Sequence, residues 1–231
     1  MPELEFVVDG RPLHVEVRDL VVAGWTGRDA KAVEDHILEL EAIGVARPRT
    51  IPCFYRLGKS LLTTAGEVDV CGLQSSGEVE CVLVSAQEGL YVGVGSDHTD
   101  RNVETYGVTV SKQMCPKPIG RELWRFSDVE DHWDSLRLRS WVTSGEDRIL
   151  YQDGPATRMR TPDDLVSRYL EGEGRLGGEC RLAAGTVLYC GTLALLSGLR
   201  PGETFEVELD DPLRHRSLTH TYQVRNLDLM D

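Results

Sequence analysis

The chain has 231 residues and a formal net charge of −13, and 41% of its residues are hydrophobic. This length suits one large domain, or one domain with a small N-terminal extension. Because the chain has no basic stripe to neutralise phosphates, we expect neither a nucleic acid nor an anionic membrane as a partner. No apolar run approaches the length of a membrane span and the first residues lack a basic leader, which predicts a soluble protein.

The cysteines are scattered and none belongs to a CxxC pair: Cys53, Cys71, Cys81, Cys115, Cys180 and Cys190. This spacing disfavours a zinc or redox protein built on cysteine. Buried free thiols in a reducing cytoplasm fit the pattern better than disulfides do. The sequence therefore predicts a cytoplasmic location.

The first residues predict a β-hairpin. Apolar and polar residues alternate over 4–8 and again over 13–17, and Asp9-Gly10 between them is a turn signal. We therefore divide the chain into an N-terminal hairpin extension, residues 1–20, and a main domain, residues 21–231.

Two helices are predicted. The first covers residues 28–43, with Thr26 as its N-cap, Asp29 three residues later as in a capping box, and Gly44 at its end. The second covers residues 162–169 and has a proline at its first position, where a missing N–H costs nothing. Both are short, and no other segment carries a convincing helical period.

Strands and extended segments account for most of the remaining pattern. They are predicted at 19–24, 48–57, 78–84, 90–95, 133–141, 148–152, 185–189, 204–209 and 221–227. Many short strands with only two helices indicate an α+β fold that is mostly β.

Glu78-Val79-Glu80 is the first pattern that could carry chemistry. Residues two apart in a strand point to the same face, where two carboxylates repel each other unless a hard divalent cation lies between them. Asp97 follows one strand and one turn later, so a hairpin would return it to this pair. Asp100 is the rival third ligand, and His98 is expected behind the ligands or in solvent. The alternative is an ordinary exposed strand followed by a solvated turn.

His36 and Glu39 lie three residues apart, on one side of the first predicted helix. Such a pair can act as a general base, because the carboxylate orients the imidazole and raises its basicity. Lys112 could hold a substrate carboxylate or stabilise an enolate, and Lys117 follows five residues later. Each of these side chains could instead be an ordinary exposed one.

In this order, the segments resemble those of the fumarylacetoacetate hydrolase family over roughly residues 20 to 230. The resemblance is carried by Gly27-Arg28 with His36-Ile37-Leu38-Glu39, Glu78-Val79-Glu80, Ser96 to Arg101, Ser111-Lys112 with Cys115-Pro116, Tyr151-Gln152, Gly185 to Thr192, and Leu199 to Glu203. The number of these segments and their order along the chain carry the resemblance. The alignment selects Asp97 over Asp100 as the third carboxylate.

The resemblance implies the family's β-roll fold with few short helices, a homodimer, and one divalent cation, Mg²⁺ or Mn²⁺. It implies metal ligands at Glu78, Glu80 and Asp97. It implies catalytic roles for His36, Glu39 and Lys112. It implies substrate contacts at Arg28, Arg101, Glu104, Gln152 and Thr192.

The sequence departs from the family pattern at several points. The stretch between Arg28 and His36 is about one helical turn longer, and Leu193 replaces the usual proline after Gly-Thr. Glu104 replaces the usual glutamine three residues after Arg101. A carboxylate adds charge and removes a donor, which hints at a substrate with an amine, amide or hydroxyl where relatives bind a plain carboxylate.

The function that follows is hydrolysis of a carbon–carbon bond in a small 2-oxo acid or acylpyruvate-like substrate, through a metal-stabilised enolate. Decarboxylation, hydration or dehydration of an oxo acid by the same site is the alternative, because these reactions share the enolate. A small-molecule-binding protein that has lost its chemistry is the rival from another class. That rival is disfavoured because His36, Glu39 and Lys112 are all present.

Overall fold

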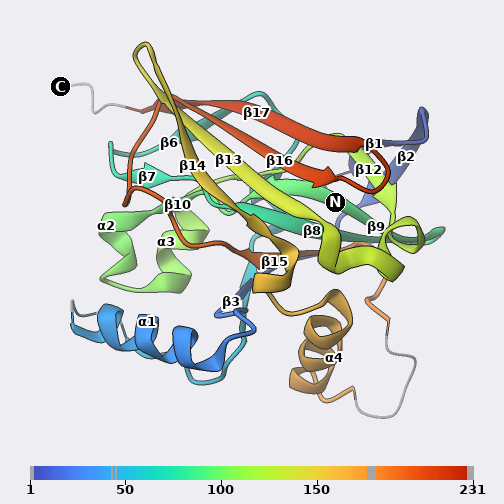
Figure 1. Ribbon diagram of the computed structural model, residues 1–231, viewed down its shortest axis with the longest axis horizontal. Coiled ribbons are helices and arrows are strands. Elements are labelled where there is room, and N and C mark those ends of the chain that lie inside the picture. Colours follow the sequence, from blue (N-terminus) through green and yellow to red (C-terminus); the bar gives the residue numbers. More distant parts are fainter. Residues whose placement is uncertain (1–2, 43, 45, 176–180, 228–231) are drawn as a thin grey trace.

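The computed structural model describes residues 3–42, 44, 46–175 and 181–227, apart from the side chains of His36 and Leu40. Most of the described elements are strands, and helices α1 to α4 lie together on one side of them (Figure 1). The predicted fold class, mostly β with a few short helices, is confirmed.

The larger sheet has eight strands in the order β2-β1-β12-β9-β8-β15-β3-β4. Its strands are β1 (Glu3–Val8), β2 (Arg11–Glu16), β3 (Asp19–Gly24), β4 (Cys53–Leu57), β8 (Val79–Ala86), β9 (Gly89–Ser96), β12 (Glu122–Arg125) and β15 (Thr186–Thr192). The central strand β8 is buried from Val79 to Ser85, so both of its faces are covered. A strand covered on both faces reads as an almost continuous apolar run, and this one does.

The second sheet has the order β14-β13-β16-β17-β6, and two strand pairs, β10-β7 and β11-β5, lie outside the large sheets. These strands are β5 (Leu62–Thr63), β6 (Glu67–Val70), β7 (Ser75–Ser76), β10 (Thr99–Asp100), β11 (Lys117–Pro118), β13 (Arg137–Ser144), β14 (Asp147–Pro155), β16 (Thr204–Asp211) and β17 (Arg216–Asn226). One core cluster joins the two sheets, with Cys81 and Leu83 from β8 and Leu138 and Val207 from β13 and β16.

The helices are α1 (Ala30–Ala42), α2 (Arg101–Glu104), α3 (Val108–Met114) and α4 (Pro162–Gly172), with 3₁₀ helices at Lys59–Leu61, Phe126–Asp128, Glu130–Ser135 and Ala156–Arg158. None of the described helices is long and apolar enough to cross a membrane. Helix α4 begins as predicted, since Thr161 caps it by accepting a hydrogen bond from Asp164 N.

The N-terminal hairpin is confirmed, and Asp9 and Gly10 both have positive φ, at 50° and 72°, as a two-residue hairpin turn requires. Strand β1 pairs in parallel with β12, and Phe6 is fully buried in a core cluster that also contains Val82 of β8. The hairpin thus forms one edge of the larger sheet. The division into residues 1–20 and 21–231 stays a prediction.

Helix α1 begins later than its sequence predicts, and its cap is Asp29 instead of Thr26. The Asp29 carboxylate accepts hydrogen bonds from Lys31 N at 2.9 Å and from Ala32 N at 3.1 Å. Residues 26–28 lie outside the helix because they pair with residues 158–160: Gly27 forms an antiparallel bridge with Met159, and Arg28 N donates to Arg158 O. This long-range pairing overrides the local capping signal.

The strand predicted at 133–141 begins only at Arg137, and Glu130–Ser135 is a 3₁₀ helix. Trp133 is buried against Phe126, with ring centroids 5.8 Å apart. The apolar residue that suggested strand alternation therefore fills the core from a helical turn. Cys53, Cys71, Cys81, Cys115 and Cys190 are free thiols, as predicted, but Cys71 is exposed and Cys53 is only partly buried. Cys180 lies outside the described residues.

Candidate metal centre

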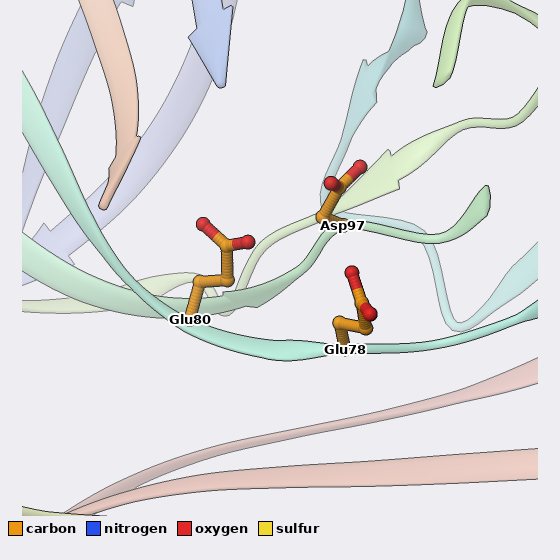
Figure 2. Close-up of side chains that lie close together, drawn as sticks. All are labelled: Glu78, Glu80 and Asp97. Atoms are coloured by element: carbon orange, nitrogen blue, oxygen red, sulfur yellow. The ribbon is translucent and has the colours of Figure 1, made fainter. Parts of the chain in front are cut away.

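The hairpin of β8 and β9 brings three carboxylates together. Glu78 directly precedes β8, Glu80 lies within it, and Asp97 directly follows β9, where its N–H donates to Glu78 O at 2.9 Å. Oxygen atoms of the three side chains all lie within 4.8 Å of one another. Figure 2 shows Glu78 and Glu80 rising from the same segment, with Asp97 beside them.

Two of the three carboxylates are buried: Glu80 is 2% exposed and Asp97 is 0% exposed. Burial raises the pKa of the Glu80 carboxyl well above its ordinary value, and the Asp97 charge raises it further. Burial also acts to raise the pKa of Asp97, but the charges of Lys112 and Lys117 outweigh it and hold that pKa at about 2. The surroundings thus move the pKa values of two close carboxyl groups in opposite directions, Glu80 upward and Asp97 downward.

The donor set fits a hard divalent cation. Every member of the cluster offers carboxylate oxygen, which Mg²⁺ and Mn²⁺ prefer, and no thiol or imidazole belongs to this cluster. Asp100 serves a different purpose, because it caps α2 by accepting from Val103 N at 3.0 Å. His98 is fully buried with Nδ1 3.0 Å from the Tyr222 hydroxyl, and burial lowers its pKa to about 3.

Glycine at position 191 is required for one contact in this group. Gly191 N donates to Glu80 Oε2 at 2.7 Å, and its φ is +93°. A Cβ at this position would lie 1.8 Å from Thr26 Oγ1. Only glycine therefore lets the backbone N–H of β15 approach the Glu80 carboxylate.

Basic side chains surround the carboxylates. Lys112 Nζ contacts Asp97 Oδ2, and Lys117 Nζ lies 3.3 Å from Asp97 Oδ1. Arg101 Nη2 lies 2.8 Å from Glu78 Oε1, and its Nη1 donates to Glu104 at 3.1 Å. Burial alone would lower the pKa of Lys112, but Asp97 and Glu78 outweigh it and raise that pKa. Cations and carboxylates alternate across the site.

A cavity of about 970 Å³ opens over this group. Of the residues predicted for the site, the cavity is lined by Arg28, Glu39, Glu78, Glu80, Asp97, Arg101, Glu104, Lys112 and Thr192. Position 36 lies within α1, but the His36 side chain is outside the described residues, so its role stays a prediction. Arg28 also has partners within the protein: it pairs with the Asp134 carboxylate and donates to Met159 O.

The sequence predicted a substrate contact for Gln152, but the structure encloses its amide in hydrogen bonds within the protein. Its oxygen accepts from Val79 N and Ser140 Oγ, both at 2.9 Å. Its nitrogen donates to Thr192 Oγ1 at 2.8 Å and to Leu193 O at 2.7 Å. Because both atoms of the amide are saturated, Gln152 ties β8, β13 and β15 together beneath the cavity.

We expect Gln152→Leu to lower the free energy of unfolding by about 3 kcal/mol, because it leaves several buried polar groups without partners. Urea denaturation measures this change. The matched control is Gln87→Leu at an exposed position in the β8–β9 turn, which should cost well under about 1 kcal/mol. Equal costs for the two variants would contradict the described role.

Sequence reasoning missed the aromatic wall of the cavity. Trp25 lines it with a φ of +62°, which is rare for a residue with a side chain and is typical of functional sites. Tyr55 also lines it, and Lys112 Nζ lies 5.7 Å from its ring centroid. Gly24 makes room for this ring, because a Cβ there would lie 2.9 Å from Tyr55 Cε2. The Gly-Trp-Thr-Gly sequence at the end of β3 was the available signal.

A family model described as "Protein of unknown function (DUF2848)" matches residues 23–222. No curated protein matches the sequence. Three solved structures illustrate what the fold resembles.

A fumarylpyruvate hydrolase from Pseudomonas aeruginosa, in complex with Mn²⁺ and pyruvate, is 13% identical with a TM-score of 0.61, covering 97% of each chain. A 2-keto-3-deoxy-D-arabinonate dehydratase, complexed with magnesium and 2,5-dioxopentanoate, is 15% identical with a TM-score of 0.60, covering 90% of this chain and 74% of that one. A protein from Yersinia pestis CO92, described as a candidate fumarylacetoacetate hydrolase family member, is 13% identical with a TM-score of 0.57, covering 94% and 96%. At these identities the likeness shows the fold, which is the β-roll that the sequence resemblance implied.

Proposed function

The chain belongs to the DUF2848 family, and on that premise we propose that it is a divalent-metal-dependent enzyme acting on small 2-oxo acids, with hydrolysis of a carbon–carbon bond as its reaction. The observation that carries the proposal is the buried cluster of Glu78, Glu80 and Asp97 at the base of a cavity, with Lys112 and Arg101 beside it. Support comes from neighbours of the same fold whose structures hold Mn²⁺ with pyruvate, or magnesium with a dioxo acid.

The chemistry assigns a separate role to each group. A Mg²⁺ or Mn²⁺ ion held by the three carboxylates would supply Lewis acidity at the 2-oxo group. In an acylpyruvate, water adds to the distal acyl carbonyl, and the bond from that carbon to the methylene breaks. The bond electrons stay on the 2-oxo fragment, which then takes a proton. We assign movement of the proton to His36, oriented by Glu39.

Lys112 and Arg101 supply positive charge to substrate oxygens where negative charge develops. Arg28 and Thr192 line the same cavity and complete the proposed substrate contacts. Dehydration of a hydroxylated oxo acid is the second candidate, favoured by the fold shared with the dehydratase. The predicted homodimer and cytoplasmic location remain expectations from the sequence.

The test is a screen of 2-oxo acids, acylpyruvates and sugar-derived oxo acids with purified protein and Mg²⁺ or Mn²⁺, followed by product mass. Hydrolysis adds the mass of water and yields two fragments, whereas dehydration removes that mass and yields one product. We expect turnover that chelation abolishes and that added Mn²⁺ restores. Turnover that persists after complete chelation would overturn the proposal.

Glu104 should influence which substrate the enzyme prefers. It donates no hydrogen bond when ionised, lies against Arg101 and faces the cavity, where its charge would repel a second substrate carboxylate. We expect Glu104→Gln to shift the ratio of kcat/KM for a dicarboxylate over a neutral-ended analogue by about tenfold toward the dicarboxylate, or about 1.4 kcal/mol.

The matched control is Glu88→Gln, which removes an exposed carboxylate from the β8–β9 turn, at the opposite end of the hairpin from the metal ligands. That ratio should not change in the control. If it is also unchanged in Glu104→Gln, then Glu104 only pairs with Arg101 and does not select the substrate.

A further inference from the structure

Two lysines contact Asp97, and their surroundings differ. Lys112 comes from α3 and lines the cavity, with Nζ on Asp97 Oδ2. Lys117 comes from β11, has a side chain that is 0% exposed, and approaches Asp97 from the other oxygen, Oδ1. Only Lys112 is therefore placed to reach a molecule in the cavity.

The Lys117 ammonium is enclosed by acceptors. Nζ donates to His98 O and to Cys115 O, the latter at 3.1 Å, and lies 3.3 Å from Asp97 Oδ1. An ammonium group has three N–H donors, and these acceptors use all of them. Lys117 thus links the turn that follows β9 to the residue that ends α3.

The backbone that carries Lys117 is fixed as well. Strand β11 pairs in parallel with β5, and Lys117 lies between Pro116 and Pro118. The Tyr189 hydroxyl has one hydrogen, which it shares between two carbonyl oxygens, Lys117 O at 3.0 Å and Pro118 O at 2.9 Å. The backbone of Lys117 is therefore fixed, and its ammonium holds the Asp97 carboxylate at a fixed position.

The two oxygens of Asp97 therefore have different partners: Oδ1 meets groups outside the cavity lining, and Oδ2 meets a lysine that lines the cavity. Thr99 Oγ1, at 3.3 Å, and Lys117 both contact Oδ1, whereas Oδ2 contacts Lys112. We propose that Lys117 is a positioning residue that fixes Oδ1 and so presents Oδ2 of Asp97 to the divalent cation, while Lys112 gives up Oδ2 and turns to the substrate. This inference rests on the metal centre of the proposed function.

The two lysines give opposite expectations, which makes a sharp test with Mn²⁺ alone as the probe. Calorimetric titration of metal-stripped protein compares wild type, Lys117→Met and Lys112→Met. Loss of a partner that orients a metal ligand typically weakens metal binding by about 10–100-fold, and we expect this for Lys117→Met. Lys112→Met removes a cation that competes for Oδ2, so its Mn²⁺ affinity should equal or exceed that of wild type.

If Lys117 acted only as a nearby positive charge, Lys117→Met should bind Mn²⁺ more tightly than wild type, because removing a positive charge strengthens the attraction of the site for Mn²⁺. Binding by Lys117→Met as tight as wild type or tighter therefore overturns the inference while leaving the proposed function intact. Failure of wild type to bind Mn²⁺ would instead overturn the metal centre itself.

Two further measurements distinguish a loss of Asp97 positioning from a loss of folding. Each metal-stripped variant should unfold on heating in a single cooperative transition, which shows that it is folded. The electron paramagnetic resonance spectrum of bound Mn²⁺ should change in Lys117→Met. If Lys117→Met does not fold, Lys117→Gln replaces it, because a neutral amide keeps two N–H donors. We expect Lys117→Gln to bind Mn²⁺ more weakly than wild type, and equal or tighter binding by a folded Lys117→Gln contradicts the role.

Discussion

Asp97→Asn is expected to weaken Mn²⁺ binding by more than about a hundredfold. The change removes one of three clustered carboxylates and leaves an amide of nearly the same shape. Loss of a group that only orients a metal ligand already costs about 10–100-fold, so the loss of a direct ligand should exceed that range. Calorimetric titration of metal-stripped protein measures the change.

Asp100→Asn is the matched control for this prediction. Asp100 is also buried and lies three residues later, but its carboxylate caps α2 by accepting from Val103 N. An asparagine oxygen can cap a helix equally well, so this variant should keep both its stability and its Mn²⁺ affinity. Wild-type Mn²⁺ affinity in Asp97→Asn would mean that Asp97 is not a ligand, and a loss confined to Asp100→Asn would make Asp100 the third ligand instead.

His36→Ala should lower kcat by about 10²–10⁴ while leaving Mn²⁺ affinity unchanged, because a general base typically contributes that factor to the rate. The prediction derives from the spacing of His36 and Glu39 on α1, and Glu39 lines the cavity. The measurement is turnover of the substrate found in the screen, with Mn²⁺ at saturating concentration.

His14→Ala provides the control, because His14 lies on β2 with a side chain that is 56% exposed. Its turnover should match wild type. A His36→Ala enzyme with wild-type turnover would remove His36 from the mechanism and point to another proton carrier in the cavity.

Local signals in the sequence predicted the parts of the fold that depend on neighbouring residues. Asp9-Gly10 specifies a hairpin turn, and the apolar run after Glu80 specifies a buried strand, because both follow from backbone preference and periodicity. Helices α2 and α3 were not predicted. They span four and seven residues, too short to display a full helical period.

The rest of the fold depends on contacts between distant segments. Gly27 forms a bridge with Met159, so the first helix starts at Ala30 instead of residue 28. No property of residues 26–29 alone could reveal this pairing. Trp133 likewise occupies a helical turn because Phe126 and the core beneath it accept the ring there.

The residues of the candidate site also fall into two groups: those that local spacing predicts, and those whose roles depend on contacts with distant segments. Glu78, Glu80 and Asp97 were predictable because one hairpin brings them together, and hairpin pairing follows from spacing. Gln152 was assigned to the substrate from the family resemblance. The partners that occupy its amide, which include Val79 and Thr192, lie far away in the sequence and could not be foreseen from it. Lys117 gave no signal beyond being a lysine, since its burial depends on β5 and on Tyr189.

The most direct test of the central claim is X-ray diffraction at the manganese absorption edge, from crystals grown with Mn²⁺ and pyruvate. We predict an anomalous peak between the carboxylates of Glu78, Glu80 and Asp97, with pyruvate beside it and the Lys112 ammonium near the pyruvate oxygens. A peak at another position, or no peak at saturating Mn²⁺, would contradict a metal-dependent oxo-acid enzyme built on this cluster.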